Sequence, residues 1–229
     1  MTSLGRGGSH NLESDRFFVA ETDEGVSSLA KPGVLFELIE SAPFVGMVSV
    51  NDRGHIASID TAGAEMLARA EATQVVGRSL ASVLSSRLAN AIEAQIRPGE
   101  VRLLRVIIEG WQLVLTGRMG KSGRGFDLVV QRHSGILPEC VSGFEIGFVS
   151  CGSFGPLSSL TDRELEVAAW IGMGLSVRQI SENLNRSIKT IENHRIALGR
   201  KLCVSDRLDI ALIAFHAGLR PSDVLLERL

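Results

Sequence analysis

The sequence has 229 residues, a length that corresponds to one or two domains. Its formal net charge of −2 excludes a globally basic, histone-like nucleic-acid binder and an acidic disordered tail, so any nucleic-acid site must be local. Hydrophobic residues make up 45% of the chain and charged residues 22%, which excludes disorder throughout and predicts a globular protein.

The three cysteines exclude two further classes of protein. They are odd in number and far apart, so they provide neither a disulfide framework nor a CxxC-type zinc site. The first residues lack the apolar stretch of a signal peptide, and no run of about 18 uncharged apolar residues occurs. We therefore expect a cytoplasmic protein with no membrane partner.

The elements predicted for the first part of the chain describe an α+β domain. Residues 1–31 are rich in glycine and acidic residues and predict a flexible N-terminal arm. A short helix is expected after Pro32, at residues 34–39. The remaining expected elements are a hairpin (44–50 and 55–59), helices (61–71 and 79–96) and three strands (101–108, 111–117 and 126–131). This order predicts one antiparallel sheet with helices on a single face.

Four short motifs give residues 32–133 a resemblance to a PAS sensor domain. They are Ile39-Glu40-Ser41-Ala42-Pro43, Gly46-Met47-Val48-Ser49-Val50, Asn51-Asp52-Arg53-Gly54 and Val75-Val76-Gly77-Arg78-Ser79-Leu80. The resemblance implies a domain that senses a ligand or a partner, and an unrelated α+β domain is the alternative. The region has no cysteine for a flavin adduct, and residues 79–96 have no histidine for haem. We expect no bound cofactor, and the sequence leaves the identity of a PAS ligand open.

Residues 134–157 predict a linker, because they contain five glycines and two prolines. One strand is expected within it, near residues 144–149. The second domain, residues 158–229, is expected to be all-α with four helices.

Helix-start signals divide the second domain into a helix-turn-helix. Thr161 with Glu164, and Ser176 with Gln179, each form a capping-box pattern, and Ser187 is a suitable N-cap for a third helix that runs towards Leu202. Two short helices joined by a tight turn, with the second longer and more polar, are the arrangement that places a helix in the major groove of DNA.

The third helix has two distinct faces. At about 100° per residue, one stripe contains the residues expected to dock, Ile191, His194, Leu198 and Leu202. The opposite stripe contains the residues free to read DNA, Lys189, Asn193, Ile196 and Arg200. Residues 176–207 carry seven basic and three acidic side chains, which is a modest phosphate-facing patch. Charge alone would fit an ordinary solvated helix face equally well.

Residues 160–219 closely resemble the LuxR-type (GerE-like) DNA-binding domain of bacterial transcriptional regulators. The matching motifs are Leu160-Thr161-x-Arg163-Glu164-x-Glu166-Val167, Gly174-Leu175-Ser176, Gln179-Ile180-Ser181-x-x-Leu184, Lys189-Thr190-Ile191-Glu192-Asn193-His194-Arg195 and Lys201-Leu202-x-Val204. The resemblance implies that the third helix enters the major groove and that the fourth pairs with a second subunit. It implies base contacts from Glu192, Asn193 and Ile196. The expected phosphate contacts are Lys189, Thr190, His194, Arg195, Arg200 and Lys201.

Three residues depart from the family pattern. Glu192 stands where many members have lysine, which predicts weaker non-specific affinity. Gly199 lies inside the third helix at a cost of about 1 kcal/mol relative to alanine. Cys203 replaces a usual glycine, at a further cost of about 1–2 kcal/mol if that position is left-handed.

The fourth helix, near residues 206–217, is apolar almost all round. We expect Leu208, Leu212 and Phe215 to face the core. The residues then left for dimerisation are Ile210, Ile213, Ala214 and Ala217.

The expected function is that of a sequence-specific transcriptional regulator, a homodimer that binds double-stranded DNA, with RNA polymerase as a further candidate partner. The alternative is a PAS/HTH-like module that binds another regulator or the polymerase instead of DNA; Glu192 and the low net charge favour it. No nucleophile elbow, HExxH motif or paired carboxylates occur, so we expect neither a catalytic nor a metal site.

Overall fold

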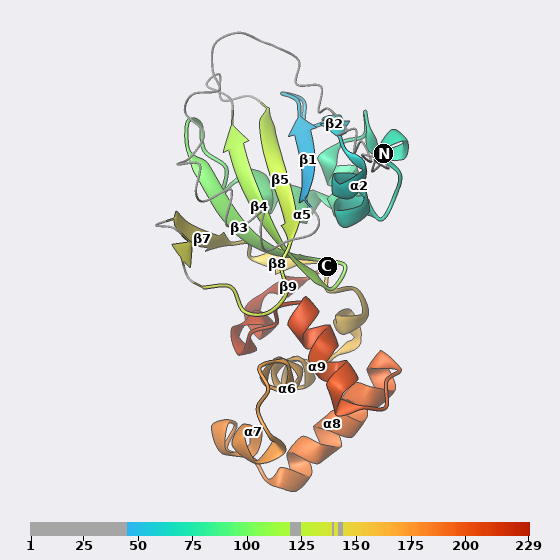
Figure 1. Cartoon of the computed structure of the whole chain (residues 1–229), viewed down its shortest axis with the longest axis vertical. Helices are drawn as coiled ribbons and strands as arrows, with labels where there is room; N and C mark the ends of the chain where they lie inside the picture. Colours follow the sequence, from blue (N-terminus) through green and yellow to red (C-terminus); the bar gives the residue numbers. More distant parts are fainter. Residues whose placement is uncertain (1–44, 120–124, 139, 142–143) are drawn as a thin grey trace, which may run out of the picture.

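The computed structural model describes residues 45–119, 125–138, 140–141 and 144–229. A twisted sheet and its covering helices form one end of the molecule, and a group of helices forms the other (Figure 1). The predicted N-terminal arm, the helix expected at residues 34–39 and residues 120–124 lie outside the described residues.

Seven strands form the large sheet, in the order β2-β1-β5-β4-β3-β7-β6. They are β1 (Val45–Val50), β2 (Ile56–Ile59), β3 (Val101–Ile108), β4 (Trp111–Met119), β5 (Phe126–Arg132), β6 (Cys140–Val141) and β7 (Phe144–Phe148). The α+β class is confirmed, and the five strands expected before residue 133 are all present. The sheet is antiparallel except that β7 pairs with β3 in parallel, because the chain crosses the sheet after β5 instead of turning back beside it.

Turn geometry sets the register of the central hairpin. Glu109 and Gly110 join β3 to β4 with φ of 52° and 76°, which are the left-handed values that a two-residue type I′ turn requires. The pairing then runs without a bulge from Ile108 opposite Trp111 to Val101 opposite Arg118. Most residues of both strands are buried, since both faces of this part of the sheet are covered.

Four short helices cover one face of the sheet. They are α2 (Thr61–Ala68), α3 (Ala72–Val75), α4 (Leu80–Leu84) and α5 (Ser86–Glu93). Side chains of Asp60, Ser79 and Ser85 accept hydrogen bonds at the N-termini of α2, α4 and α5, which explains why the predicted second helix is divided. Leu80, Leu88 and Ile92 are fully buried against the sheet.

The C-terminal part contains the four predicted helices. They are α6 (Asp162–Gly172), α7 (Val177–Asn183), α8 (Ile188–Leu202) and α9 (Arg207–His216). A short 3-10 helix, η2 (Gly155–Ser159), precedes them, and another, η3 (Pro221–Leu225), follows. Their core includes Leu165, Ile180, Ile191 and Leu198, all fully buried.

Residues of the predicted linker are built into both parts of the molecule. The strand expected near residues 144–149 is β7, Leu137 is buried against the sheet, and Phe154 and Leu157 are fully buried in the core of the helical part. A second, two-stranded parallel sheet joins β8 (Cys151–Gly152) to β9 (Glu227–Arg228). The domain boundaries themselves stay a prediction.

Among the helices of the described residues, none is long and apolar enough to cross a membrane.

Candidate nucleic-acid interface

Local hydrogen bonds explain where α6 and the two helices of the helix-turn-helix, α7 and α8, begin. Both expected capping boxes are present: Glu164 Oε2 accepts from the Thr161 backbone N–H at 2.8 Å, and Gln179 Oε1 accepts from that of Ser176 at 2.8 Å. Ser187 Oγ accepts from the Thr190 backbone N–H at 3.1 Å and starts α8. The hydroxyl of Thr190 also lies 2.8 Å from that of Ser187.

The two faces of α8 lie as its periodicity predicts. Ile191 and Leu198 are fully buried, while His194 and Leu202 are half-buried at the edge of the same face. The opposite face is exposed and contains Lys189, Asn193, Ile196 and Arg200. Of the other expected base-contacting residues, Glu192 is half-buried. The helix lies at the end of the molecule farthest from the sheet, so the sheet does not cover its exposed face (Figure 1).

Four cationic side chains near α8 are unpaired within the described residues. The side chains of Arg186, Lys189, Arg195 and Arg200 form no hydrogen bond or ion pair in that part of the chain. Their full charge is therefore available to an anion.

Lys201 differs from these residues, because its ammonium group is already bound. Lys201 Nζ donates to Glu164 Oε2 at 2.6 Å and to the Ser159 carbonyl at 3.1 Å, which ties the last turn of α8 to the start of α6. Burial raises the pKa of the Glu164 carboxyl, but the hydrogen bonds from Lys201 and Thr161 outweigh it, so the pKa lies below its usual value. The expected phosphate contact of Lys201 competes with this pair.

The two unusual residues near the end of α8 have clear structural roles. A Cβ atom on Gly199 would lie 2.7 Å from the Val204 carbonyl oxygen, so the following chain requires glycine there. Cys203 is the C-cap and has a φ of 57°, which is the left-handed conformation. The recognition helix reaches Leu202 despite both departures.

The predicted orientation of α9 is wrong. Ile210, Ala214 and Ala217 are buried in the core, so three of the four residues proposed for dimerisation are not available. The exposed apolar side chains are instead the three that were expected to face the core, Leu208 (61% exposed), Leu212 (47%) and Phe215 (44%). Close approach to α6 decides the orientation, since a Cβ on Gly172 would lie only 2.7 Å from that of Ala214.

No set of three metal-ligating side chains gathers anywhere in the described residues. On the sheet side, an open depression with a volume of about 640 Å³ lies between α2, α3 and the start of β4. Arg69, Glu71, Trp111 and Arg132 are among its lining residues, and the guanidinium of Arg132 lies 4.5 Å from the ring centre of Trp111.

The helical part matches a known protein family. Residues 158–214 match the family described as bacterial regulatory proteins, luxR family. The response regulator UvrY of Escherichia coli (strain K12) is 34% identical over 70 residues, which are 31% of this chain and 32% of UvrY. The transcriptional regulatory protein LiaR of Bacillus subtilis is 42% identical over 64 residues, 28% of this chain and 30% of LiaR. The chain thus spans about a third of the length of these curated relatives.

Solved structures give weaker likenesses over a longer stretch. A Vibrio cholerae VqmA–ligand–DNA complex is 17% identical and covers 88% of this chain and 95% of its own, with a TM-score of 0.40. A domain of an HTR-like protein from Haloarcula marismortui is 22% identical over 38% of this chain and 96% of its own, with a TM-score of 0.33.

Proposed function

Residues 158–214 form a DNA-binding domain of the luxR family of bacterial regulatory proteins, and from this premise we propose that the chain is a sequence-specific transcriptional regulator. Its PAS-like part senses a ligand or partner and controls binding of double-stranded DNA by α8. Such a regulator acts on the chromosome, hence in the cytoplasm, and RNA polymerase is a further candidate partner.

The proposal rests on the exposed face of α8. Asn193 can bind adenine through two hydrogen bonds, Glu192 can accept a hydrogen bond from cytosine, and the Ile196 side chain can contact the methyl group of thymine. These three residues are the proposed base contacts.

Phosphate contacts are assigned to the residues around that face. Lys189, Arg195 and Arg200 have unpaired charges, and Thr190 and His194 lie at its border. Lys201 joins them only if a phosphate replaces the Glu164 carboxylate. Because the free charges gather at α8 in a chain of net charge −2, binding should be local and steeply dependent on salt.

We propose that the regulator is a homodimer that pairs through the exposed side of α9. Leu208, Leu212 and Phe215 follow one another at helical spacing and are all more than two-fifths exposed. A two-fold pair of such faces would bury this stripe and present two recognition helices to a two-fold operator.

Selection of bound duplexes from a random DNA pool tests the proposal. Wild type should enrich a two-fold motif. Asn193→Ala should lose about 1–3 kcal/mol at one base position only, because a bidentate base contact is removed. Asn90→Ala, an exposed helical asparagine on the sheet side, is the matched control and should enrich the wild-type motif.

The phosphate assignments need a separate measurement. Lys189→Ala should weaken all duplexes alike and lower the slope of log Kd against log salt by about one unit. A binding constant insensitive to salt, without any enriched motif, would contradict DNA binding and favour the alternative of a protein-interaction module.

A further inference from the structure

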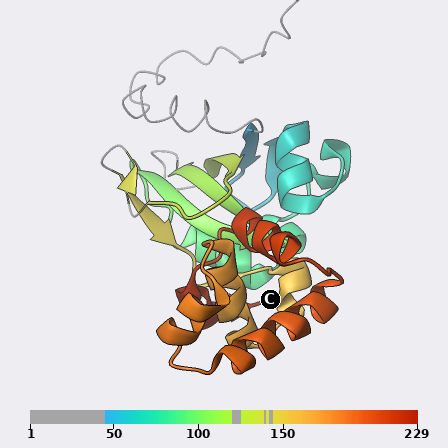
Figure 2. The same cartoon turned by 60° about the horizontal axis from the view of Figure 1, so that its bottom comes forward.

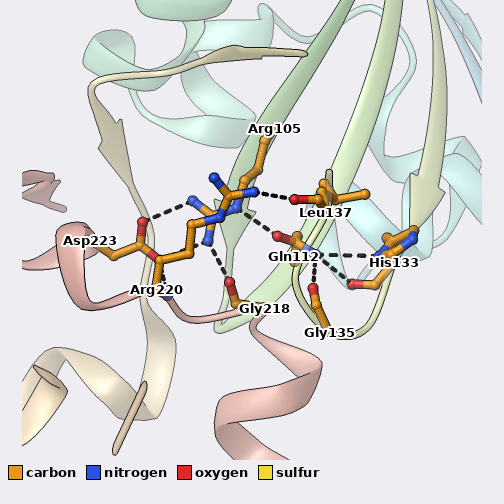
Figure 3. Close-up of polar contacts among 8 residues, drawn as sticks. All are labelled: Arg105, Gln112, His133, Gly135, Leu137, Gly218, Arg220 and Asp223. Atoms are coloured by element: carbon orange, nitrogen blue, oxygen red, sulfur yellow. Dashed lines mark hydrogen bonds and ion pairs between the residues drawn. The ribbon is translucent and has the colours of Figure 1, made fainter. Parts of the chain in front are cut away.

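A buried polar cluster joins the sheet to the segment that follows α9 (Figure 3). Its centre is Arg105 of β3, whose side chain is 1% exposed. Arg105 Nη1 and Nη2 donate to the two carboxylate oxygens of Asp223 in η3 at 2.9 and 2.7 Å, and Nη2 also donates to the Gly218 carbonyl at 2.8 Å. Arg105 Nε donates to Gln112 Oε1 at 2.6 Å. The Asp223 side chain is 5% exposed, so both charges of this bidentate ion pair are removed from water.

Gln112 extends the cluster to the last turn of α9. Its Nε2 donates to the Gly135 carbonyl at 2.8 Å, and Gly135 donates from its backbone N–H to the Phe215 carbonyl at 2.7 Å. Figures 1 and 2 both place α9 between the sheet and α8. The end of α9 is therefore held against the hairpin that β3 and β4 form.

Trp111, which precedes Gln112 at the start of β4, lies between α9 and an open depression. Its ring centre is 4.9 Å from that of His216, the last residue of α9, and His216 Nδ1 lies 3.0 Å from the Ser134 hydroxyl. Trp111 also lines the depression between α2, α3 and β4. A molecule bound in that depression would contact the same ring that packs against α9.

The depression is lined by charged side chains of both signs. Its volume of about 640 Å³ lies within the usual range of small-molecule sites, about 300–1,000 Å³. Arg69 and Arg132 line it, and so do Glu65 and Glu71. In the part of the chain that the structure describes, none of these four side chains forms an ion pair. Their charges are therefore available to a ligand.

Both arginines are held close to Trp111. The guanidinium of Arg132 lies 4.5 Å from the ring centre, and its Nε is buried without a hydrogen-bond partner among the described residues. Arg69 Nη2 donates to the Glu109 carbonyl at 3.1 Å, in the turn that precedes Trp111. A buried donor without a partner is unfavourable, so an acceptor at the Arg132 guanidinium would supply a contact that these residues do not.

We propose that this depression binds a small zwitterion of the α-amino acid class. The carboxylate of the ligand accepts hydrogen bonds from Arg69 and Arg132, and its ammonium group donates to Glu65 and Glu71. A simple anion is repelled by the two glutamates and a simple cation by the two arginines, so a ligand that carries both charges fits this lining. The inference rests on the proposed function, because it names what the PAS-like part senses.

The indole signals of the two tryptophans test the site without DNA. Isotope labelling of tryptophan gives one N–H signal from Trp111 and one from Trp170 in α6, and Trp111→Phe assigns them. The common L-α-amino acids are titrated one at a time, with acetate and methylammonium as single-charge probes. At least one amino acid should shift the Trp111 signal with a Kd at least roughly tenfold below those of both probes, because each probe lacks one of the two charged contacts. The Trp170 signal should move less.

Two variants separate the two charges of the ligand. Arg69→Met should weaken binding of both the amino acid and acetate by roughly tenfold or more. Glu71→Gln should weaken binding of the amino acid alone. Both side chains are exposed, so neither change should affect folding. Arg102→Met, which removes an arginine of β3 that is paired with Glu100 outside the depression, is the matched control and should keep the wild-type Kd values.

The outcomes decide for or against the site. An amino acid that binds more tightly than both probes and loses affinity in both variants supports it. A Trp111 signal that no amino acid shifts, acetate bound as tightly as the best amino acid, or unchanged binding in either variant overturns it. Because the titration contains no DNA, its failure leaves DNA binding by α8 untouched. If wild type selects no duplex, the proposed function fails, while the titration still decides whether the depression binds an amino acid.

Discussion

Gly199 shows how one residue can contradict its intrinsic propensity. In an isolated helix, Gly→Ala is worth about 1 kcal/mol of stabilisation. Here the chain after α8 folds back so that Val204 donates to the Gly199 carbonyl at 2.9 Å and its own carbonyl occupies the space of a Cβ. Helix propensity alone therefore cannot account for the glycine.

We expect Gly199→Ala to destabilise the protein by about 1–3 kcal/mol, the usual cost of overpacking. Urea unfolding monitored by circular dichroism measures the difference. Ala197→Gly is the control, because it loses helix propensity without adding atoms. A more stable Gly199→Ala protein would contradict the contact with Val204.

Glu164 makes stability depend on pH. Its pKa is lowered in the fold, so the folded state favours the ionised carboxyl. The resulting stabilisation is complete above the usual glutamate value of about 4.3 and is lost as the pH falls through the lowered value. The Lys201 ammonium supplies much of this effect.

Lys201→Met should accordingly lower the free energy of unfolding at pH 7 by about 1 kcal/mol, a small figure because Lys201 is partly solvated. The difference from wild type should shrink towards zero as the carboxyl becomes protonated. Denaturant unfolding over a pH series measures it. Lys189→Met, which removes an unpaired charge, should show no such convergence.

At the scale of elements, the exposed face of α9 allows a test of the proposed dimer. Leu212→Glu should convert the proposed dimer to a monomer, because it places a charge in the exposed stripe, and it should leave the stability of the protomer nearly unchanged. Sedimentation velocity gives the oligomeric state. Leu225→Glu makes the same change at an 84% exposed position of η3 and should remain dimeric.

Ile210 provides the contrasting result on the same helix. Since it is 2% exposed, Ile210→Ala should cost about 2–5 kcal/mol of stability and leave assembly of the folded protein intact. A Leu212→Glu protein that stays dimeric at the concentrations used for wild type would rule out the proposed face.

The elements were predictable where a local signal specified them. Capping side chains at Thr161, Ser176 and Ser187 mark the helix starts, and the two-residue turn at Glu109 and Gly110 marks the central hairpin. The buried face of α8 also follows from its periodicity. The face of α9 does not, because a helix that is apolar nearly all round has no preferred direction until α6 packs against it.

At the scale of the whole molecule, the buried pair should make the two parts unfold together. Removing one partner of a buried ion pair costs about 3–5 kcal/mol, because the other charge remains buried. We expect a single calorimetric transition for wild type. In Asp223→Asn the helical part should lose its support and unfold in a separate, earlier transition.

Arg102→Met is again the control, since its partner Glu100 is exposed, and it should keep the single transition. One transition for Asp223→Asn at the wild-type temperature would show that the pair contributes little to the coupling.

The contact between the two parts could not be predicted from the sequence. Arg105 and Asp223 lie 118 residues apart, and neither belongs to a local pattern. Arg105 lies between the apolar residues Leu104 and Val106, so its burial depends on a partner that only the folded chain brings near. The glycines and prolines of residues 134–157 likewise predict only a linker. The packing of this segment against both parts of the molecule leaves no signal in the local sequence.

Gly218 restricts which substitutions the buried cluster can accept during evolution. It has a φ of 52°, and a Cβ there would lie 2.3 Å from the Gln112 side chain. A larger residue at position 218 would displace Gln112 and remove a partner of Arg105. Mutations at these three positions are therefore not independent during evolution: in an alignment of close homologues, we expect residues 105, 112 and 218 to change together, and a lineage that loses the glycine to lose the glutamine as well.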